Sequence, residues 1–133
     1  MIRILVVEDE LIVGIALGEE LQDLGAEAIV TGDAESAIQH LSQATIDAAI
    51  IDIELPGMRG DLFAKECRRR YPHLPIVVAT GMQAKHVRAW FGHDPKLEVL
   101  EKPHDFHSVR SALARLGVVL LSVAASDKTP SSA

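Results

Sequence analysis

The chain has very little cysteine and no excess of basic residues, and both shortages exclude classes of protein. Its single cysteine, Cys67, cannot form an internal disulfide, which fits a reducing compartment. Its 19 acidic residues outnumber its 13 basic residues, so the formal net charge is -6. Nucleic acids and anionic membranes both attract basic surfaces, and we therefore expect neither of them to be the main partner.

Long apolar runs are missing as well. The apolar stretch at residues 118–121 is far shorter than the about 20 residues that a membrane-spanning helix needs. The apolar residues 2–7 lead directly into the acidic residues 8–10, which is unlike an export signal. These two features predict a cytoplasmic protein.

The length and the apolar content fit one domain with its own core. The chain has 133 residues, 48% of them hydrophobic and 24% charged, which provides enough apolar material for a core and too few charges for general disorder. We expect this domain to occupy residues 1–124. Residues 125–133 are small and polar, and we expect a short disordered tail there.

Strand-like and helix-like segments alternate along the chain. Short runs rich in Val and Ile predict strands buried on both faces, at residues 2–7, 28–30, 46–53, 76–79 and 97–100. Longer segments predict helices at residues 11–24, 34–43, 62–70, 83–91 and about 105–124. Asp33 and Asp61 are expected N-caps, and Leu55-Pro56-Gly57 is expected to form a turn. The alternation predicts an α/β fold, with an open five-stranded parallel sheet and helices on both of its faces.

Polar residues follow four of these predicted strands. They are Glu8 and Asp9 after the first strand, Asp52 at the end of the third, Thr80 after the fourth and Lys102 after the fifth. Sites in open parallel sheets form at the carboxyl ends of the strands. We therefore expect three carboxylates, a hydroxyl and an ammonium group to converge at one edge of the sheet.

The carboxylates indicate a metal site. Acidic residues also favour helix N-termini, which explains Glu8, Asp9 and Glu10 when they are taken alone. It does not explain Asp52, because an ionised group inside the apolar run 48–53 needs a cation or several hydrogen-bond donors nearby. Clustered carboxylates retain a proton unless a divalent ion neutralises them, and a set of hard oxygen ligands suits Mg²⁺.

Thr80 and Lys102 extend the metal site into a phosphate-binding site. Each of them alone would be ordinary, since threonines are common at strand ends and lysines at surfaces. Beside Mg²⁺, the lysine can pair with one phosphoryl oxygen while the threonine hydroxyl bonds another. Asp52 is then placed to act as a carboxylate nucleophile toward phosphorus.

These positions resemble those of the receiver domain of two-component response regulators. The likeness covers about residues 2–120, and the matching features are Glu8-Asp9, the segment 52–60, Thr80 and Lys102-Pro103. The resemblance implies a flavodoxin-like fold with strand order 2-1-3-4-5. It also implies that a histidine kinase or a histidine phosphotransfer protein donates a phosphoryl group from a phosphohistidine to the chain.

The resemblance further implies a role for each site residue. Asp52 would be the phosphoacceptor, and Thr80 and Lys102 would contact the phosphoryl group. Mg²⁺ would be bound by Glu8, Asp9, Asp52 and the main-chain carbonyl of Glu54. The protein would then be a signalling switch that catalyses its own phosphorylation and dephosphorylation. Movement of Thr80 would reposition the fourth helix and the fifth strand, and so alter a surface that a downstream protein binds.

The sequence departs from the family at three positions near the site, and one of them is Gly81, which follows Thr80 where the family more commonly has alanine. Val99 stands three residues before the lysine, where the family usually has an aromatic residue that rotates inward on activation. Trp90 and Phe91 could replace that aromatic residue, although ordinary packing explains them more simply. Glu54 is acidic and lies two residues after Asp52, so it should change the lifetime of the phosphorylated state in a direction that the sequence does not specify.

Other interpretations remain open at this point. A phosphohydrolase with an aspartyl-phosphate intermediate would also use Asp52 and Mg²⁺, but it needs a cap over its substrate, and the chain has no insertion long enough for one. A receiver that binds its partner regardless of phosphorylation would signal unchanged with Asp52→Asn. The apolar residues 117–123 either cover the core or form a partner or homodimer face.

Overall fold

The computed structural model describes residues 1–55, 59–102 and 105–120 of the chain. Pro56 and Gly57 of the expected turn lie outside these ranges, as do Pro103 and the expected tail at residues 125–133. None of the helices within the described ranges combines the length and the apolar character that a membrane crossing requires.

Parallel strands form one five-stranded sheet in the order β2-β1-β3-β4-β5. The strands are β1 (Arg3–Val7), β2 (Glu27–Thr31), β3 (Ala48–Asp52), β4 (Ile76–Thr80) and β5 (Leu97–Glu101). Every residue of β3 and β4 is buried, as expected for strands that are covered on both faces. This topology confirms the predicted open α/β fold and its strand order.

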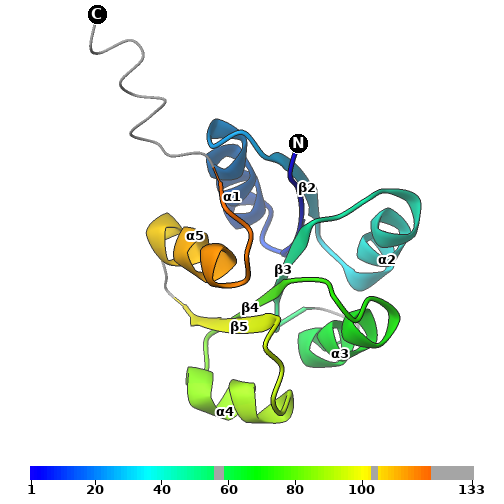
Figure 1. Cartoon of the computed structure of the whole chain (residues 1–133), viewed down its shortest axis with the longest axis vertical. Helices are drawn as coiled ribbons and strands as arrows, with labels where there is room; N and C mark the ends of the chain where they lie inside the picture. The colour runs from blue at the N-terminus through cyan, green and yellow to red at the C-terminus, as the bar shows by residue number, and fades with distance from the viewer. Residues whose placement is uncertain (56–58, 103–104, 121–133) are drawn as a thin grey trace, which may run out of the picture.

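Helices cover both faces of the sheet (Figure 1). They are α1 (Leu11–Asp23), α2 (Ala34–Gln43), α3 (Gly60–Arg70), α4 (Ala84–Trp90) and α5 (Phe106–Arg115). On one face, α1 and α5 pack in a core that contains Leu21, Val109 and Leu113. On the other face, α2, α3 and α4 contribute to a second core that contains Phe63 and Val87. Because successive strand residues point into opposite cores, the two layers together fix the position of each strand.

The last helix is shorter than the sequence predicts. α5 ends at Arg115 rather than near residue 124, and Gly117 has a φ of 89°, in the left-handed region that commonly ends a helix. Val118 and Leu120 then pack against the core at 8% and 5% exposure, whereas Val119 is 70% exposed. The interpretation that this segment covers the core is therefore confirmed for Val118 and Leu120. The helical prediction is wrong because the apolar pattern reflects alternate burial of a non-helical segment.

One of the two predicted N-caps is confirmed and the other is wrong. The Asp33 carboxylate accepts a hydrogen bond from the Ser36 N–H at 2.8 Å and caps α2. Asp61 does not cap α3, because α3 begins at Gly60 and has Arg59 as its N-cap. Asp61 instead lies in the first turn, where it is 4% exposed and pairs with the Arg59 guanidinium at 2.6 Å. Acidic residues are favoured both at the N-cap and in the first turn, so residue type alone does not separate the two positions.

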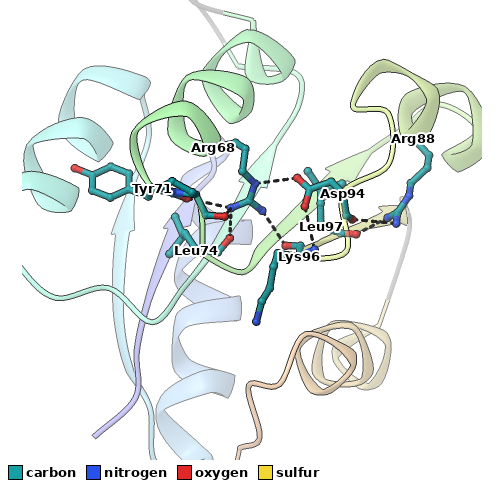
Figure 2. A network of polar contacts seen from close by, with 8 residues as sticks. Arg68, Tyr71, Leu74, Arg88, Asp94, Lys96 and Leu97 are labelled. Carbon is teal, nitrogen blue, oxygen red and sulfur yellow. Dashed lines mark hydrogen bonds and ion pairs between the residues drawn. The ribbon is translucent and has the colours of Figure 1, made fainter.

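Arg68, near the C-terminal end of α3, joins that helix to the segment before β5 (Figure 2). Its Nε donates to the Asp94 carboxylate at 2.8 Å, and its Nη1 donates to the main-chain carbonyl of Leu74 at 2.6 Å. Arg88 of α4 approaches the same region and donates to the main-chain carbonyl of Leu97. These contacts fix the start of β5 relative to α3 and α4. The other end of β5 is followed by Lys102, one of the predicted site residues.

We expect Arg68→Lys to lower the free energy of unfolding by about 1–3 kcal/mol, because lysine lacks the planar fork that reaches both Asp94 and the loop carbonyls. Urea unfolding measures this loss. Arg69→Lys is the matched control, since Arg69 is 70% exposed and its contact is to the neighbouring Glu66 on the same helix. The control should change stability by less than about 0.5 kcal/mol. Equal losses in the two variants would contradict the structural role of Arg68.

Candidate functional site

The ends of four strands bring the predicted polar residues to one edge of the sheet. The parallel register pairs Val7 of β1 with Ile51 of β3, and Thr80 of β4 with Glu101 of β5, so these strands finish at a similar level. Each strand therefore delivers its last residue, or the residues just after it, to the same place. The residues at this edge are Glu8, Asp9, Asp52, Thr80 and Lys102.

Glu8, Asp9 and Asp52 form an acidic cluster at this edge. Each offers a carboxylate oxygen, and these oxygens all lie within 4.8 Å of one another. Glu8 and Asp52 are 8% and 3% exposed, whereas Asp9 is exposed to solvent. Burial, followed by the contact with Asp52, raises the pKa of Glu8 to about 7. Glu8 therefore resists ionisation, and a divalent cation beside it would favour its charged form.

The donor set of this cluster fits Mg²⁺. All three side chains offer hard carboxylate oxygens, which Mg²⁺ prefers over nitrogen or sulfur ligands. The exposed position of Asp9 leaves the cluster open to solvent, and Mg²⁺ usually keeps several water ligands. Glu54, whose main-chain carbonyl is the fourth predicted ligand, belongs to the segment that directly follows Asp52.

Asp52 is held from two sides. Its Oδ2 accepts a hydrogen bond from Lys102 Nζ at 2.8 Å, and its Oδ1 accepts one from the Glu54 N–H at 2.9 Å. Burial lowers the pKa of Lys102, but the hydrogen bond and charge of Asp52, together with the charges of Glu8 and Glu54, raise it above its ordinary value. Lys102 therefore stays charged at neutral pH and balances part of the acidic cluster.

Thr80 is fully buried at the end of β4 and makes two hydrogen bonds through its hydroxyl. Its Oγ1 accepts from the Met82 N–H at 2.9 Å and donates to Glu54 Oε2 at 3.3 Å. The Glu54 carboxylate, 49% exposed, also lies 3.6 Å from Lys102 Nζ. The sequence suggests an effect of Glu54 but does not reveal this bridge, because spacing does not show which way an exposed side chain turns.

Gly60 allows the segment after Asp52 to fold back against β3. The Gly60 N–H donates to the Ile53 carbonyl at 2.9 Å. A Cβ atom at this position would lie 2.4 Å from both the Ile53 Cα and the Asp52 carbonyl oxygen. Any side chain here would displace the backbone that carries Asp52, so the site requires glycine. The sequence places Gly60 at the end of the matching segment without showing this contact.

A cavity of about 640 Å³ lies between α1 and α5, and Glu8, Asp52 and Lys102 are among its lining residues. Most of its other lining side chains are apolar, and Ile12 extends that apolar lining onto the start of α1. Leu11 and Ile12 are 68% and 83% exposed. An exposed apolar surface therefore adjoins the polar site. The run of aliphatic residues at the start of the helix is the sequence signal that could have identified it.

The position of the usual switch aromatic contains a half-buried valine. Val99 packs against the core beneath α2, α3 and α4. Phe91 packs against the same core, with Lys65 Nζ 5.9 Å from the centroid of its ring. Trp90 ends α4 and is 39% exposed. Packing explains Phe91, and Trp90 lies at the surface, as the simpler of the two sequence interpretations expects.

Sequence comparisons match the chain to one protein family. The family model for the response regulator receiver domain matches residues 4–114. The response regulator protein FleR of Pseudomonas aeruginosa is 29% identical over 113 residues, which are 85% of this chain and 24% of FleR. The sensory transduction protein RegX3 of Mycolicibacterium smegmatis is 32% identical over 123 residues, 90% of this chain and 51% of RegX3. The chain thus spans about a quarter to about half of the length of these curated relatives.

Solved structures agree with the sequence comparisons. The response regulator TrrA of Thermotoga maritima, solved in complex with Mg²⁺ and BeF, aligns with a TM-score of 0.76 and 31% identity over 87% of this chain and 99% of that chain. The chemotaxis response regulator CheY4 of Vibrio cholerae aligns with a TM-score of 0.79 and 25% identity over 87% of this chain and 98% of that chain. The match of the family model over most of the chain, on the fold and strand-end residues described above, shows that the chain belongs to the response regulator receiver domain family.

Proposed function

We propose that the protein is a phosphorylation switch in which Asp52 accepts a phosphoryl group from a phosphohistidine of a partner protein. The observation that carries the proposal is the setting of Asp52 at the end of β3. Its carboxylate is 3% exposed, lies 2.8 Å from Lys102 Nζ, and belongs to a cluster of carboxylates that suits Mg²⁺. A buried carboxylate with a charged donor and a metal-binding cluster beside it is well placed for nucleophilic attack on phosphorus.

Phosphoryl transfer would proceed through direct attack by Asp52. One carboxylate oxygen forms a bond to phosphorus while the P–N bond of the donor breaks, and the electron pair stays on the imidazole nitrogen. Glu8, Asp9, Asp52 and the main-chain carbonyl of Glu54 would hold Mg²⁺, which supplies positive charge to the carboxylates and to the transferring group. Lys102 and Thr80 bind phosphoryl oxygens. Attack by water on phosphorus later releases inorganic phosphate and restores the Asp52 carboxylate, which resets the switch.

The exposed start of α1 fits a docking surface for the phosphoryl donor. Ile12 lines the same cavity as Asp52 and Lys102, so a protein bound over α1 would bring its histidine close to Asp52. Leu11 and Ile12 offer exposed aliphatic side chains that a partner can bury. The partner would be a histidine kinase or a histidine phosphotransfer protein.

The surface formed by α4 and β5 fits the readout of phosphorylation. Thr80 lies just before α4, so a turn of its hydroxyl toward a phosphoryl group would change the loop that enters this helix. α4 is tied to β5 at both ends, because the Ala84 N–H donates to Glu101 Oε1 at 2.6 Å and Arg88 donates to the Leu97 carbonyl. A shift of α4 would therefore carry β5 with it, even without an aromatic residue at the usual switch position.

The extent of the domain and its location in the cell belong to the same proposal. We assign residues 1–124 to one receiver domain and place it in the cytoplasm. A single cysteine without an internal partner fits that compartment. Cys67 is buried in the core, and burial raises the pKa of its thiol to about 12, which keeps it protonated and unreactive. We propose that the switch acts on a separate downstream protein or on a further part of a longer regulator.

Incubation with acetyl phosphate and Mg²⁺ should add the mass of one phosphoryl group to the wild-type chain. Asp52→Asn should show no adduct, and neither protein should show one without Mg²⁺, because both the nucleophile and the cation are required. Intact mass spectrometry after rapid acid quenching measures the outcome. If the wild-type protein shows no adduct, it should still bind beryllofluoride in the presence of Mg²⁺. A wild-type protein that neither forms the adduct nor binds beryllofluoride would contradict the proposal and favour a receiver that binds its partner regardless of phosphorylation.

Ile12→Ser should slow phosphoryl transfer from a protein donor about tenfold more than it slows phosphorylation by acetyl phosphate, because loss of a central apolar contact costs about 1–2 kcal/mol in protein binding. Purified, autophosphorylated histidine kinases would be screened at short times, and the fastest donor would be used. Val119→Ser is the control, since Val119 is 70% exposed and is absent from the cavity lining. An equal effect of Ile12→Ser on both donors would contradict docking over α1.

A further inference from the structure

We propose that Glu54 is a latch, meaning a side chain that engages both phosphoryl-binding groups of the resting protein and must leave them when Asp52 is phosphorylated. The inference rests on the proposed function, because it concerns the same site. It adds what the sequence does not specify, namely the direction in which Glu54 acts. Four observations about Thr80, Lys102, Gly81 and the exposure of Glu54 support it.

The only proton of the Thr80 hydroxyl is already donated in the resting structure. Its oxygen accepts a hydrogen bond from the Met82 N–H at 2.9 Å, and it donates to Glu54 Oε2 at 3.3 Å. A hydroxyl has a single proton to donate. Thr80 therefore cannot donate to a phosphoryl oxygen until its contact with Glu54 is broken.

The ammonium group of Lys102 is shared between two carboxylates. It lies 2.8 Å from Asp52 Oδ2 and 3.6 Å from Glu54 Oε1. A phosphoryl group on Asp52 would need the same ammonium group to bind one of its oxygens. The two oxygens of Glu54 thus contact the two side chains that phosphoryl oxygens are proposed to contact.

The path of the side chain explains how one residue reaches both groups. Glu54 follows β3, yet its Oε1 lies 3.9 Å from where a Cβ of Gly81 would be, beside the segment that follows β4. That distance is an ordinary van der Waals contact, so the Glu54 side chain extends alongside this segment. The Glu54 side chain is 49% exposed, so it can turn into solvent without the cost of breaking a buried ion pair.

Charge sets the direction of the effect. A phosphoryl group carries up to about two negative charges, and a carboxylate beside it is repelled. Glu54 must therefore both give up its contacts and move away when the phosphoryl group arrives. The latch stabilises the unphosphorylated state and weakens binding of any tetrahedral anion at Asp52.

Beryllofluoride binding tests the latch without hydrolysis, so a role of Glu54 in positioning the attacking water does not affect the result. With Mg²⁺ at saturation, Glu54→Ala should bind beryllofluoride about five- to twentyfold more tightly than wild type, since it loses both a charged hydrogen bond and a partly exposed ion pair. Glu54→Gln should lie between the two, because its amide oxygen can still accept from Thr80. Isothermal titration calorimetry gives these Kd values.

The Mg²⁺ affinity of the same variants provides a second readout. It should stay unchanged or weaken, because the proposed ligand is the main-chain carbonyl of Glu54 and the variants remove only negative charge. A general loosening of the site would weaken both Mg²⁺ and beryllofluoride binding. Tighter beryllofluoride binding without tighter Mg²⁺ binding therefore supports the latch, and weaker binding of both ligands overturns it.

Glu10→Gln is the matched control, since it removes one negative charge from the lining of the cavity that Asp52 and Lys102 also line. If the Glu10 and Glu54 variants bind beryllofluoride with equally increased affinity, the loss of any negative charge near the site explains the effect, and the latch is overturned. Wild-type and Glu54 variants with the same Kd for beryllofluoride would also overturn it, while the proposed function stands. No beryllofluoride binding by any of the proteins would overturn the proposed function, and the latch with it.

Discussion

The repulsion among carboxylates that are crowded around a buried aspartate is the constraint on which this site depends. Asp52 and Glu8 are almost inaccessible to solvent, and Asp9 places a third carboxylate within 4.8 Å of them. Lys102 relieves part of that repulsion, while burial and then the contact with Asp52 raise the pKa of Glu8. A site of this kind suits a divalent cation and a further cationic or hydrogen-bonding group beside Asp52, and phosphoryl transfer to a carboxylate needs both.

The rest of the fold holds this unfavourable arrangement in place. Two apolar layers clamp the sheet from both faces, and the strand register brings the charged residues to one edge. Gly60 lets the segment after Asp52 fold back on β3. At the opposite end of β5 from the site, Arg68 binds Asp94 and so fixes the segment that precedes this strand. The stability of the cores and of these tethers therefore offsets the electrostatic cost of the site. Such a balance suits the proposed switch, in which added charge at Asp52 would change the contacts of Thr80 and, through them, of α4.

Sequence reasoning predicted the topology and the composition of the site because both follow from simple periodic features. Buried parallel strands read as continuous apolar runs, and polar residues that end such runs must meet at one edge. Other features depend on tertiary packing and were missed or wrong. The end of α5 was wrong because the apolar run at residues 118–121 has no periodicity of its own, so the alternate burial of Val118 and Leu120 shows only in the structure. The bridge made by the Glu54 side chain and the cavity beside α1 depend on where side chains turn and how helices are spaced, which local sequence does not encode.

Trapping the phosphoryl group at its attachment site tests the central claim most directly. Borohydride reduces an acyl phosphate to an alcohol and leaves free carboxylates intact, so it converts a phosphorylated aspartate to homoserine. After treatment with acetyl phosphate and Mg²⁺, peptide mapping should find homoserine at position 52 and unmodified residues at Glu8, Asp9 and Glu54. Reduction at one of those other carboxylates, with Asp52 unchanged, would contradict the assignment of Asp52 as the phosphoacceptor.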